Sequence, residues 1–426
     1  VYDEKEMANL IDSSLEFYLT AGKYDKKFCE KLGQFLKVKN NPRINVLTVN
    51  SGSSANLIAL SALTSPKLKD LALIEGHEVI TVAAGFPTSI APIIQNKLVP
   101  VFVDVELGNY NIDASQVEKA ISDKTKAIMI AHTLGIPFDL DGILTIAEKY
   151  GLWVIEDNCD ALGAEYTLKR EYNLIKNRKI SGTAKTGTIG HIGTSSFYPA
   201  HQITMGEGGA IYTYDYDLSR IALSLRNWGR DCWCDPGRDN TCGKRFEWEL
   251  GLLPKGYDHK YIYSHLGYNL KITDMQAAIG LAQLEKLSGF VEARYKNWKQ
   301  LNEGLKDLKN AFILPKHPEN AKPSPFGFAL TIKENDFFAR KDITGFLEKQ
   351  NIQTRTVFAG NMLRQPALTN ANIKMRMTNS GILYSNELTD NDMKQLPNTE
   401  TVMSRTFWIG VYPGLKAEML DFMIEK

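Results

Sequence analysis

The stretch NVLTVNSGSSANLIALSAL, residues 45–63, joins two patterns that together decide the fold class. Its first six residues form a short β-branched run typical of a strand, and the segment SANLIALSAL has the spacing of a helix. The turn SGSSAN lies between them, so the sequence predicts a strand that leads into a helix. Strands that alternate with helices in this way are typical of α/β domains.

The same alternation continues along the chain after this stretch. Further strand-like runs alternate with amphipathic segments such as ASQVEKAIS and DGILTIAEKYG. These runs are HEVITVA, VPVFVDV, KAIMIAH, LWVIED, TSSFYP and GAIYTY. We therefore predict an α/β fold with a large, mixed and mostly parallel sheet that carries helices on both faces.

Changes of pattern divide the chain into three predicted parts. Residues 1–40 have helical spacing and predict an N-terminal helical segment, and residues 41–290 predict the large α/β domain. After the helix-like DMQAAIGLAQLEKL, prolines interrupt the pattern at KHPENAKPSPFG, and residues 291–426 predict a smaller C-terminal α+β domain. Residues 165–187 carry six Lys or Arg residues and little apolar periodicity, so we interpret them as an exposed basic loop inserted in the large domain.

The composition argues against several classes of protein. The 426 residues are 43% hydrophobic, and 50 Lys and Arg nearly balance 49 Asp and Glu, so no net charge attracts nucleic acid or a membrane surface. Apolar runs are far shorter than the roughly 20 residues of a membrane span. Without a signal-peptide pattern, we expect a cytoplasmic protein. Five cysteines are too few for a secreted disulfide framework and favour metal or catalytic thiols.

Small polar residues follow two of the predicted strands, at the sheet edge where open α/β sheets bind their ligands. Gly52 and Ser53 open a helix, whose N-terminus offers N–H donors to a phosphate group. Ser196, in the run TSSFYP, offers a second hydroxyl. Small residues also cap ordinary helices, so a purely structural cap is the alternative for this pattern taken alone.

Phe86 and Asp157 follow two other predicted strands and suggest a flat, cationic ligand. Phe86, in AAGFPTS, is placed where an aromatic ring would lie over a flat cofactor, although a core position is the alternative. Asp157 ends the apolar run LWVIED, where a carboxylate is costly without a cationic partner. A protonated pyridine nitrogen is such a partner, and a helix cap is the alternative role.

Several of these segments together resemble one known family. The segments GSSAN, AAGFPTS, IEDNCDALGA, SFYPAH, GEGGA, RNWG and HLGYNLKITDMQAAIGLAQLEKL are similar to the DegT/DnrJ/EryC1 family of pyridoxal-phosphate sugar aminotransferases, over nearly the whole chain. The resemblance implies the fold-type I architecture of pyridoxal-phosphate (PLP) enzymes and a homodimer with the cofactor near the dimer interface. It implies that Asn227 reaches the cofactor phosphate of the other subunit and that Asn269 lies near the active site.

The stretch SSFYPAHQITMGEGGA departs from the family at one position, because His201 stands where the cofactor's lysine would be. An imidazole has no primary amine with which to hold the cofactor covalently, but its ordinary pKa near 6.5 suits proton transfer. We therefore expect a noncovalent cofactor, pyridoxamine 5′-phosphate (PMP), with His201 as the catalytic base. An inactive homologue is the alternative.

Three cysteines, Cys232, Cys234 and Cys242, follow RNWG with the spacing C-x-C-x7-C. Within the family, histidine in place of lysine resembles the sugar 3-dehydrases, of which some use PMP alone and others add an iron–sulfur cluster. This spacing, with Cys159 as a distant fourth cysteine, resembles the cluster-binding kind and implies a [2Fe–2S] centre on four thiolates. Cys29 is left as an ordinary buried cysteine. A zinc site and unliganded thiols are the alternatives.

The resemblance implies an enzyme that removes the 3-hydroxyl of a nucleotide-linked 4-keto-6-deoxyhexose in 3,6-dideoxyhexose synthesis for surface polysaccharide. It implies CDP as the nucleotide, with dTDP and GDP as the alternatives. That reaction consumes two electrons, so an NADH-dependent flavin and iron–sulfur reductase is the implied partner. Arg355 and Arg364 are candidates to neutralise the sugar nucleotide's diphosphate, with surface salt bridges as the alternative. The alternative activities are a cluster-free PMP-dependent 3-dehydratase, an aminotransferase and an inactive sugar-nucleotide-binding protein.

Overall fold

A computed structural model describes residues 1–37, 44–234 and 240–426. The chain forms two compact units, each built from segments that are distant in sequence. The first unit holds Val1, Ile74–Gly193 and Leu287–Lys426, and the second holds Tyr2–Leu73 and Thr194–Lys286. Among the helices described, none is both long and apolar enough to cross a membrane. The domain boundaries near residues 40 and 290 stay a prediction.

The first unit contains a mostly parallel run of strands in the order β5-β4-β2-β3-β16-β17. The pairs β5–β4, β4–β2, β2–β3 and β3–β16 are parallel, and only β16–β17 is antiparallel. These strands are β2 (Glu78–Val82), β3 (Val99–Val103), β4 (Thr125–Ala131), β5 (Trp153–Asp157), β16 (Lys374–Met377) and β17 (Leu383–Tyr384). Every residue of β2, β3 and β5 is buried, as expected of strands covered on both faces.

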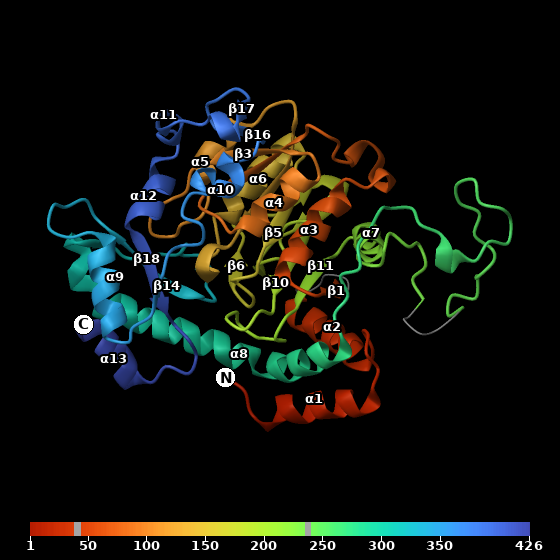
Figure 1. Cartoon of the computed structure of the whole chain (residues 1–426), viewed down its shortest axis with the longest axis horizontal. Helices are drawn as coiled ribbons and strands as arrows, with labels where there is room; N and C mark the ends of the chain where they lie inside the picture. Colours follow the sequence, from red (N-terminus) through yellow and green to blue (C-terminus); the bar gives the residue numbers. More distant parts are fainter. Residues whose placement is uncertain (38–43, 235–239) are drawn as a thin grey trace. The chain divides into compact units, whose positions relative to one another are not determined.

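Helices α4 (Pro87–Gln95) and α6 (Leu140–Tyr150) lie beside the sheet of the first unit (Figure 1), and α5 (Ala114–Val117) contacts α6. Buried residues of α10 (Pro366–Thr369) and α11 (Asp390–Met393) pack with β3 and β16, whereas α12 (Pro397–Arg405) contacts another sheet of this unit. The predicted α/β class is therefore confirmed, because strand-like runs and amphipathic segments alternate in the structure as they do in the sequence.

A second, antiparallel sheet of the first unit lies in the C-terminal part of the chain. Its order is β12-β14-β18-β15, from β12 (Phe312–Ile313), β14 (Gly327–Ile332), β15 (Thr354–Arg355) and β18 (Thr406–Gly410). Phe328 and Phe407 of this sheet pack with Leu347 of α9 (Arg340–Lys349) and Leu420 of α13 (Ala417–Glu425). The C-terminal part of the chain therefore contains both strands and helices.

The segment 165–187 is not the exposed loop that its basic composition predicted. It forms four short strands: β6 (Glu165–Thr167), β7 (Tyr172–Leu174), β8 (Arg178–Ile180) and β9 (Thr183–Lys185). Buried Asp141 accepts hydrogen bonds from the hydroxyls of Tyr166, at 3.1 Å, and Tyr172, at 2.7 Å. The alternation of buried apolar and exposed basic residues is the period of a strand, and charge counting alone concealed it.

The second unit places β11 (Gly209–Thr213) between β1 (Asn45–Val49) and β10 (Ile192–Ser196). Strands β1 and β11 pair antiparallel. The helices of this unit are α1 (Glu4–Glu16), α2 (Lys23–Leu36), α3 (Gly52–Leu63), α7 (Tyr216–Arg226) and the first part of α8 (Asp274–Gly304). The helical pair predicted at the N-terminus is present. Helix α8 runs past the predicted end at residue 287, because buried Leu287, Val291, Trp298 and Leu301 keep the helical spacing.

Asp274, at the start of α8, caps a different helix. Its carboxylate accepts backbone N–H bonds from Gly22, Tyr24 and Asp25 at 2.9, 3.1 and 2.8 Å, and so satisfies the first turn of α2. We expect Asp274→Ala to lower stability by about 2 kcal/mol, because buried N–H groups lose their acceptor. Thermal and urea denaturation measure this effect. Exposed Glu285→Ala on the same helix is the control and should change stability much less.

Candidate active site

The start of α3 in the second unit has the features of a phosphate-binding site. The Ser51 hydroxyl accepts the backbone N–H of Ser54 at 3.1 Å and caps the helix, while Gly52 is buried and Ser53 is exposed. A Cβ atom at Gly209 would overlap the Ser51 carbonyl, so this glycine lets β11 pass close to the helix start. The twelve-residue helix α3 thus begins beside exposed Ser53, and the first turn of a helix is the part whose N–H groups can donate to a phosphate.

Ser196 and His201 belong to one tight turn that follows β10. The Ser196 hydroxyl accepts the backbone N–H of Tyr198 at 3.4 Å, and the backbone N–H of His201 bonds the carbonyl of Tyr198 at 3.0 Å. The His201 ring lies edge-on to the Tyr198 ring, with centroids 6.5 Å apart. The turn returns to the strand where Met205 N–H bonds the Phe197 carbonyl at 2.9 Å. A half-buried imidazole is therefore held at a strand end, where proton transfer to a bound ligand is feasible.

Asn227 and Asn269, both named from the sequence, lie side by side in the second unit. Their backbones form an isolated antiparallel bridge, and the amide oxygen of Asn227 accepts from the guanidinium of buried Arg226 at 3.1 Å. Lys271, which the sequence analysis missed, donates to the Asn269 side chain at 2.5 Å and lies 3.6 Å from the ring centroid of Trp228. Burial and the charges of Arg226 and Arg230 lower the pKa of Lys271 to about 8.

A cavity of about 810 Å³ opens beside Asn227 in the second unit, and Cys234 and Trp233 line another part of its wall. Its size is that of a small-molecule site. Asp25 and Arg226 also line it, and burial raises the pKa of Asp25 although Arg226 opposes the shift. Within this unit, the predicted phosphate ligand Asn227 and one predicted metal ligand therefore share a cavity.

The two residues predicted to hold a pyridine ring lie in the first unit. Buried Asp157 ends β5, and its carboxylate accepts the Ser89 hydroxyl at 2.6 Å and the Cys159 backbone N–H at 3.2 Å. Turns rather than a helix follow it, so Asp157 is not a helix cap. Phe86 precedes α4, is 49% exposed and meets the ring of Phe358 at 6.1 Å. Phe86 is therefore not a core residue.

Asp160 is a second buried carboxylate close to Asp157 in sequence. Burial, together with the charge of Asp157, raises the pKa of Asp160 to about 7, although the Leu134 backbone N–H donates to it at 3.2 Å. Between these two pKa values, Asp160 is protonated in the folded chain. In the unfolded chain, where its pKa has the ordinary value of 3.8, it is ionised over the same range. Stability must then fall as the pH rises from about 4 to about 7 and level off above that range.

We expect Asp160→Asn to remove this pH dependence. The wild-type protein should lose about 1.4 kcal/mol of stability for each pH unit inside the window, and the variant should not. Thermal melting of the cofactor-free protein at several pH values measures the difference. Exposed Asp123→Asn is the control. A variant that keeps the wild-type slope would contradict the raised pKa.

Three of the four predicted metal ligands gather around one histidine in the second unit. The sulfurs of Cys232, Cys234 and Cys242 lie 3.8, 4.0 and 3.6 Å from Nε2 of His259, which begins the short helix η5 (His259–Tyr261). Burial raises the pKa of Cys232 to about 11. Burial also opposes ionisation of Cys234, but hydrogen bonds from Thr241 and the other two cysteines lower its pKa to about 7.

Backbone geometry fixes the start of this cysteine segment. Gly229 has a φ of +85°, and a Cβ atom there would overlap the carbonyl oxygen of His265. Asp231, beside Cys232, accepts the Lys67 ammonium at 2.5 Å and also binds Ser264. Gly229, the glycine of the segment RNWG, is therefore required by the structure, because only glycine fits this close approach. Part of the C-x-C-x7-C segment, residues 235–239, lies outside the described residues.

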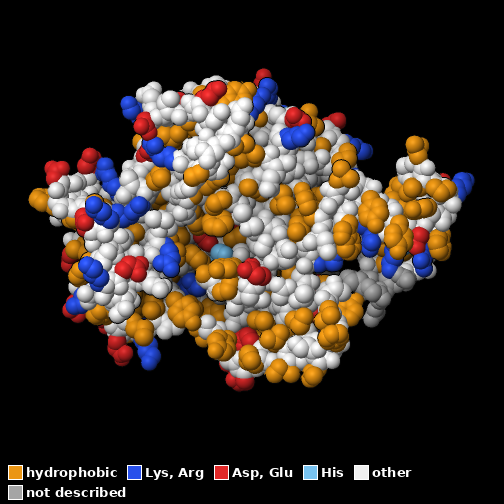
Figure 2. Space-filling view, viewed as in Figure 1, with side chains coloured by type: hydrophobic (Ala, Val, Ile, Leu, Met, Phe, Trp, Pro, Cys, Tyr) orange, Lys and Arg blue, Asp and Glu red, His pale blue; other side chains and the backbone are white. Residues whose placement is uncertain are grey.

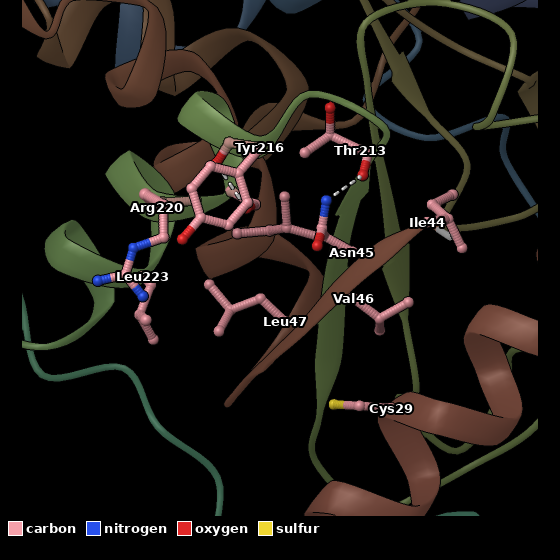
Figure 3. A pocket seen from close by; sticks show the side chains of 12 residues that line it. Cys29, Ile44, Asn45, Val46, Leu47, Thr213, Tyr216, Arg220 and Leu223 are labelled. Atoms are coloured by element: carbon pink, nitrogen blue, oxygen red, sulfur yellow. Dashed lines mark hydrogen bonds between the residues drawn. The ribbon is translucent and has the colours of Figure 1, made fainter. Parts of the chain in front are cut away.

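Cys159 and Cys29 are the remaining two cysteines. Cys159 belongs to the first unit, is half-buried and bonds Asp157 through its backbone. Cys29 borders a cavity of about 280 Å³ between β1 and α7, where Asn45, Leu47 and Tyr216 face one another (Figure 3). Burial and the charge of Asp25 raise the pKa of the Cys29 thiol well above its ordinary value, in keeping with a structural cysteine.

The two candidate diphosphate ligands of the first unit differ in their surroundings. Arg364 is already paired with Glu400, at 2.7 Å, and Asp390, at 2.8 Å. Exposed Arg355 bonds the carbonyl of Thr354 at 2.8 Å. The ion pairs of Arg364 agree with the salt-bridge alternative, which leaves Arg355 as the better candidate for an anion.

Comparison with known proteins supplies both a family and relatives. The profile of the DegT/DnrJ/EryC1/StrS aminotransferase family matches residues 2–426. The lipopolysaccharide biosynthesis protein RfbH of Salmonella typhimurium is 52% identical over 426 residues, which cover 100% of this chain and 89% of that protein. The dTDP-4-dehydro-2,6-dideoxy-D-glucose 3-dehydratase of Saccharopolyspora spinosa is 47% identical over 425 residues, which cover 100% of this chain and 84% of that protein.

Solved structures give the same fold. The chain is similar to an E coli GDP-4-keto-6-deoxy-D-mannose-3-dehydratase with bound hydrated PLP, at a TM-score of 0.80 and 25% identity. The similarity covers 100% of this chain and 97% of that one. Other similar structures are aminotransferases, such as one from Psychrobacter cryohalolentis, at a TM-score of 0.79 and 21% identity. The predicted fold-type I architecture is therefore confirmed.

Proposed function

The chain belongs to the DegT/DnrJ/EryC1/StrS aminotransferase family, and on that premise we propose that it removes the 3-hydroxyl of a nucleotide-linked 4-keto-6-deoxyhexose. The observation that carries the proposal is His201, an imidazole in the turn after β10, where the resemblance to the family places a lysine. Without that amine the cofactor is held noncovalently, as PMP. Relatives named 3-dehydratases support the same reaction class.

The proposed reaction replaces a hydroxyl by hydrogen at C3 of the sugar. The C3–O bond breaks, the oxygen leaves as water, and two electrons and two protons are consumed. NADH is the proposed source of the electrons, through a flavin and iron–sulfur reductase. Cys232, Cys234, Cys242 and Cys159 would hold a [2Fe–2S] centre, which would supply one-electron chemistry. We propose CDP as the nucleotide. Arg355 is the proposed contact to its diphosphate, and Arg364 contributes only if its ion pairs open.

The chain's own residues divide the work between holding the cofactor and moving a proton. We propose that Gly52, Ser53 and Ser196 hold the phosphate, with Asn227 supplied by the other subunit. Phe86 covers the ring, and Asp157 accepts the hydrogen bond of the pyridine nitrogen and keeps it protonated. PMP supplies an amine that condenses with the 4-keto group and a ring that withdraws electrons. His201 takes the proton from the carbon next to that amine.

The residues of the structure fit these cofactors. Asp157 is a buried carboxylate that accepts hydrogen bonds from the Ser89 hydroxyl and the Cys159 backbone N–H, and a buried carboxylate suits a cationic partner. Three cysteine sulfurs within 4.0 Å of one imidazole nitrogen suit a metal centre. Thiols of this kind must stay reduced, which fits a cytoplasmic enzyme.

We also propose a homodimer. The segment between α7 and α8 in the second unit carries many exposed apolar side chains, and Figure 2 shows hydrophobic side chains gathered along it. They include Trp233, Phe246, Leu250, Leu252, Leu253 and Tyr257, and Leu252 is fully exposed. Apolar side chains in such number favour an interface. Light scattering coupled to gel filtration should give twice the mass of the chain.

The activity test combines colour, metal analysis and product mass. Protein purified without oxygen should be brown, contain iron and sulfide, and give an electron paramagnetic resonance (EPR) signal after reduction. With PMP, NADH, a reductase and CDP-4-keto-6-deoxyglucose, the product should lack one oxygen atom. An amino sugar as the product would contradict the proposal.

The similarity to a 3-dehydratase solved with hydrated PLP favours a second candidate, a 3-dehydratase that works without a cluster. That candidate predicts a colourless protein that turns over with PMP and an amino donor alone. The two candidates therefore differ in their need for iron and for a reductase.

A further inference from the structure

The ring of Phe358 makes the one aromatic contact found for Phe86 in the described part of the chain. The two ring centroids are 6.1 Å apart and the ring planes meet at 77°, which is an edge-to-face arrangement. Both residues belong to the first unit, Phe86 just before α4 and Phe358 between β15 and η7 (Met362–Arg364). Edge-to-face pairs contribute stabilisation beyond the area that they bury, so they favour one relative orientation of the two rings.

The backbone of Phe86 is fixed more firmly than its side chain. Pro87 follows it and restricts Phe86 to extended backbone angles, and φ is −78° and ψ is 142° there. The carbonyl of Phe86 accepts the Ser89 backbone N–H at 3.0 Å. The side chain, in contrast, is 49% exposed. A half-exposed ring needs a neighbour that selects its rotamer, and Phe358 is in contact with it.

Phe358 occupies a backbone position that favours glycine. The backbone N–H of Gly360 bonds the Val357 carbonyl at 2.9 Å and closes a four-residue turn with Phe358 and Ala359 at its centre. Of these two central residues, only Phe358 has a positive φ, +44°. That combination is typical of a type II′ turn, whose first central residue is usually glycine. A bulky aromatic residue is costly there, so we expect its ring to do something that glycine cannot.

The surroundings attach this turn to the segment that carries Phe86. The Met362 backbone N–H, just after the turn, bonds the Ala83 carbonyl at 3.0 Å, three residues before Phe86. Met362 and Ala83 also share a buried apolar cluster with Ile90 of α4. Phe86 lies between Ala83 and Ile90 in sequence, so the cluster fixes the turn of Phe358 against the chain on both sides of Phe86.

We infer that Phe358 is a positioning residue for the cofactor, and that its ring holds Phe86 in the orientation that covers the pyridine ring of PMP. This role rests on the proposed function, in which Phe86 covers that ring. Phe358 acts on the cofactor only through Phe86. The costly backbone of Phe358 has its reason here, because glycine would suit the turn but would leave Phe86 without an aromatic partner.

Cofactor binding to single and double variants of the full-length protein tests this role. The variants are Phe358→Leu, Phe86→Leu, the double variant with both changes, and Phe358→Tyr, which keeps the ring. Phe337→Leu, at a side chain of the same unit that is 92% exposed, is the control. PMP is titrated into each cofactor-free protein and its binding is followed by absorbance. The circular dichroism of bound PMP reports the asymmetry around its ring, and thermal melting of the cofactor-free proteins reports their stability.

We expect Phe358→Leu to bind PMP about 2- to 10-fold more weakly, which is the contribution of an edge-to-face pair, and to change the circular dichroism of the bound cofactor. Phe358→Tyr and Phe337→Leu should behave like the wild type. When Phe86→Leu is already present, the change at Phe358 should have no further effect on PMP affinity, because the ring through which it acts is gone.

Three results would overturn the inference. Unchanged PMP affinity and circular dichroism in Phe358→Leu, with a lower melting temperature, would leave Phe358 a purely structural role. An equal loss of affinity with and without Phe86→Leu would mean that Phe358 does not act through Phe86. A higher KM for the sugar nucleotide at unchanged PMP affinity would assign the ring to the substrate. A wild-type protein that does not bind PMP is a distinct result, because it would refute the proposed function itself and the inference with it.

Discussion

His201→Asn is expected to bind PMP normally but to turn over the sugar nucleotide about 10²- to 10⁴-fold more slowly, which is the usual contribution of a positioned acid or base. Asparagine is close to histidine in size and keeps the backbone bond to Tyr198 that closes the turn after β10. It has no group that takes a proton near neutral pH. Stopped turnover with unchanged cofactor affinity, measured by absorbance titration and product formation, would identify His201 as the base.

His201→Lys tests the same position in the opposite direction. A primary amine at this place should bind pyridoxal phosphate covalently, so that borohydride fixes the cofactor to the chain, and the removal of the hydroxyl should cease. Tyr198→Phe, which changes the neighbouring ring but not the base, is the control. Wild-type turnover in His201→Asn would assign the proton transfer to another group, of which Lys271, with a pKa of about 8, is one.

Most of the architecture could be predicted because the strands of the first unit are buried on both faces. Runs such as VPVFVDV stand out in sequence, and β3 is buried along its whole length. Two predictions of secondary structure were wrong, one for the end of helix α8 and one for residues 165–187. Helix α8 was ended too early, although Trp298 and Leu301 continue its buried face. The strands at 165–187 were missed because the count of basic residues concealed the alternation of buried apolar and exposed basic side chains, and the partner of Tyr166 and Tyr172, Asp141, lies outside the segment.

The candidate site was predictable where its residues follow strands or share a motif. Asn227 and Asn269 were both named from the sequence, and the structure joins them by a backbone bridge. The position of His259 beside three of the cysteines was not predicted, because the spacing C-x-C-x7-C does not say which other side chain the thiols fold around. The low pKa of Lys271 was not predictable, because it comes from burial beside arginines that only folding brings together.

Asp157→Asn is the second change with a large expected effect. Removal of one partner from a buried charge pair costs about 3–5 kcal/mol, so turnover with PMP should fall about 10²- to 10⁴-fold. The asparagine oxygen still accepts the Ser89 hydroxyl bond, which is 2.6 Å long in the wild type, so the fold is preserved. Ser89→Ala is the matched control and should cost less, because it removes only a neutral donor from the same carboxylate.

The charge of Asp157 has a second, independent readout in Asp160. That charge helps burial to raise the pKa of Asp160 to about 7, so Asp157→Asn should lower this pKa. The pH range in which the cofactor-free protein loses stability should then end at a lower pH than in the wild type. Ser89→Ala should leave the range in place. If Asp157→Asn slowed turnover without moving the range, Asp157 would not carry the charge that the pyridine nitrogen requires.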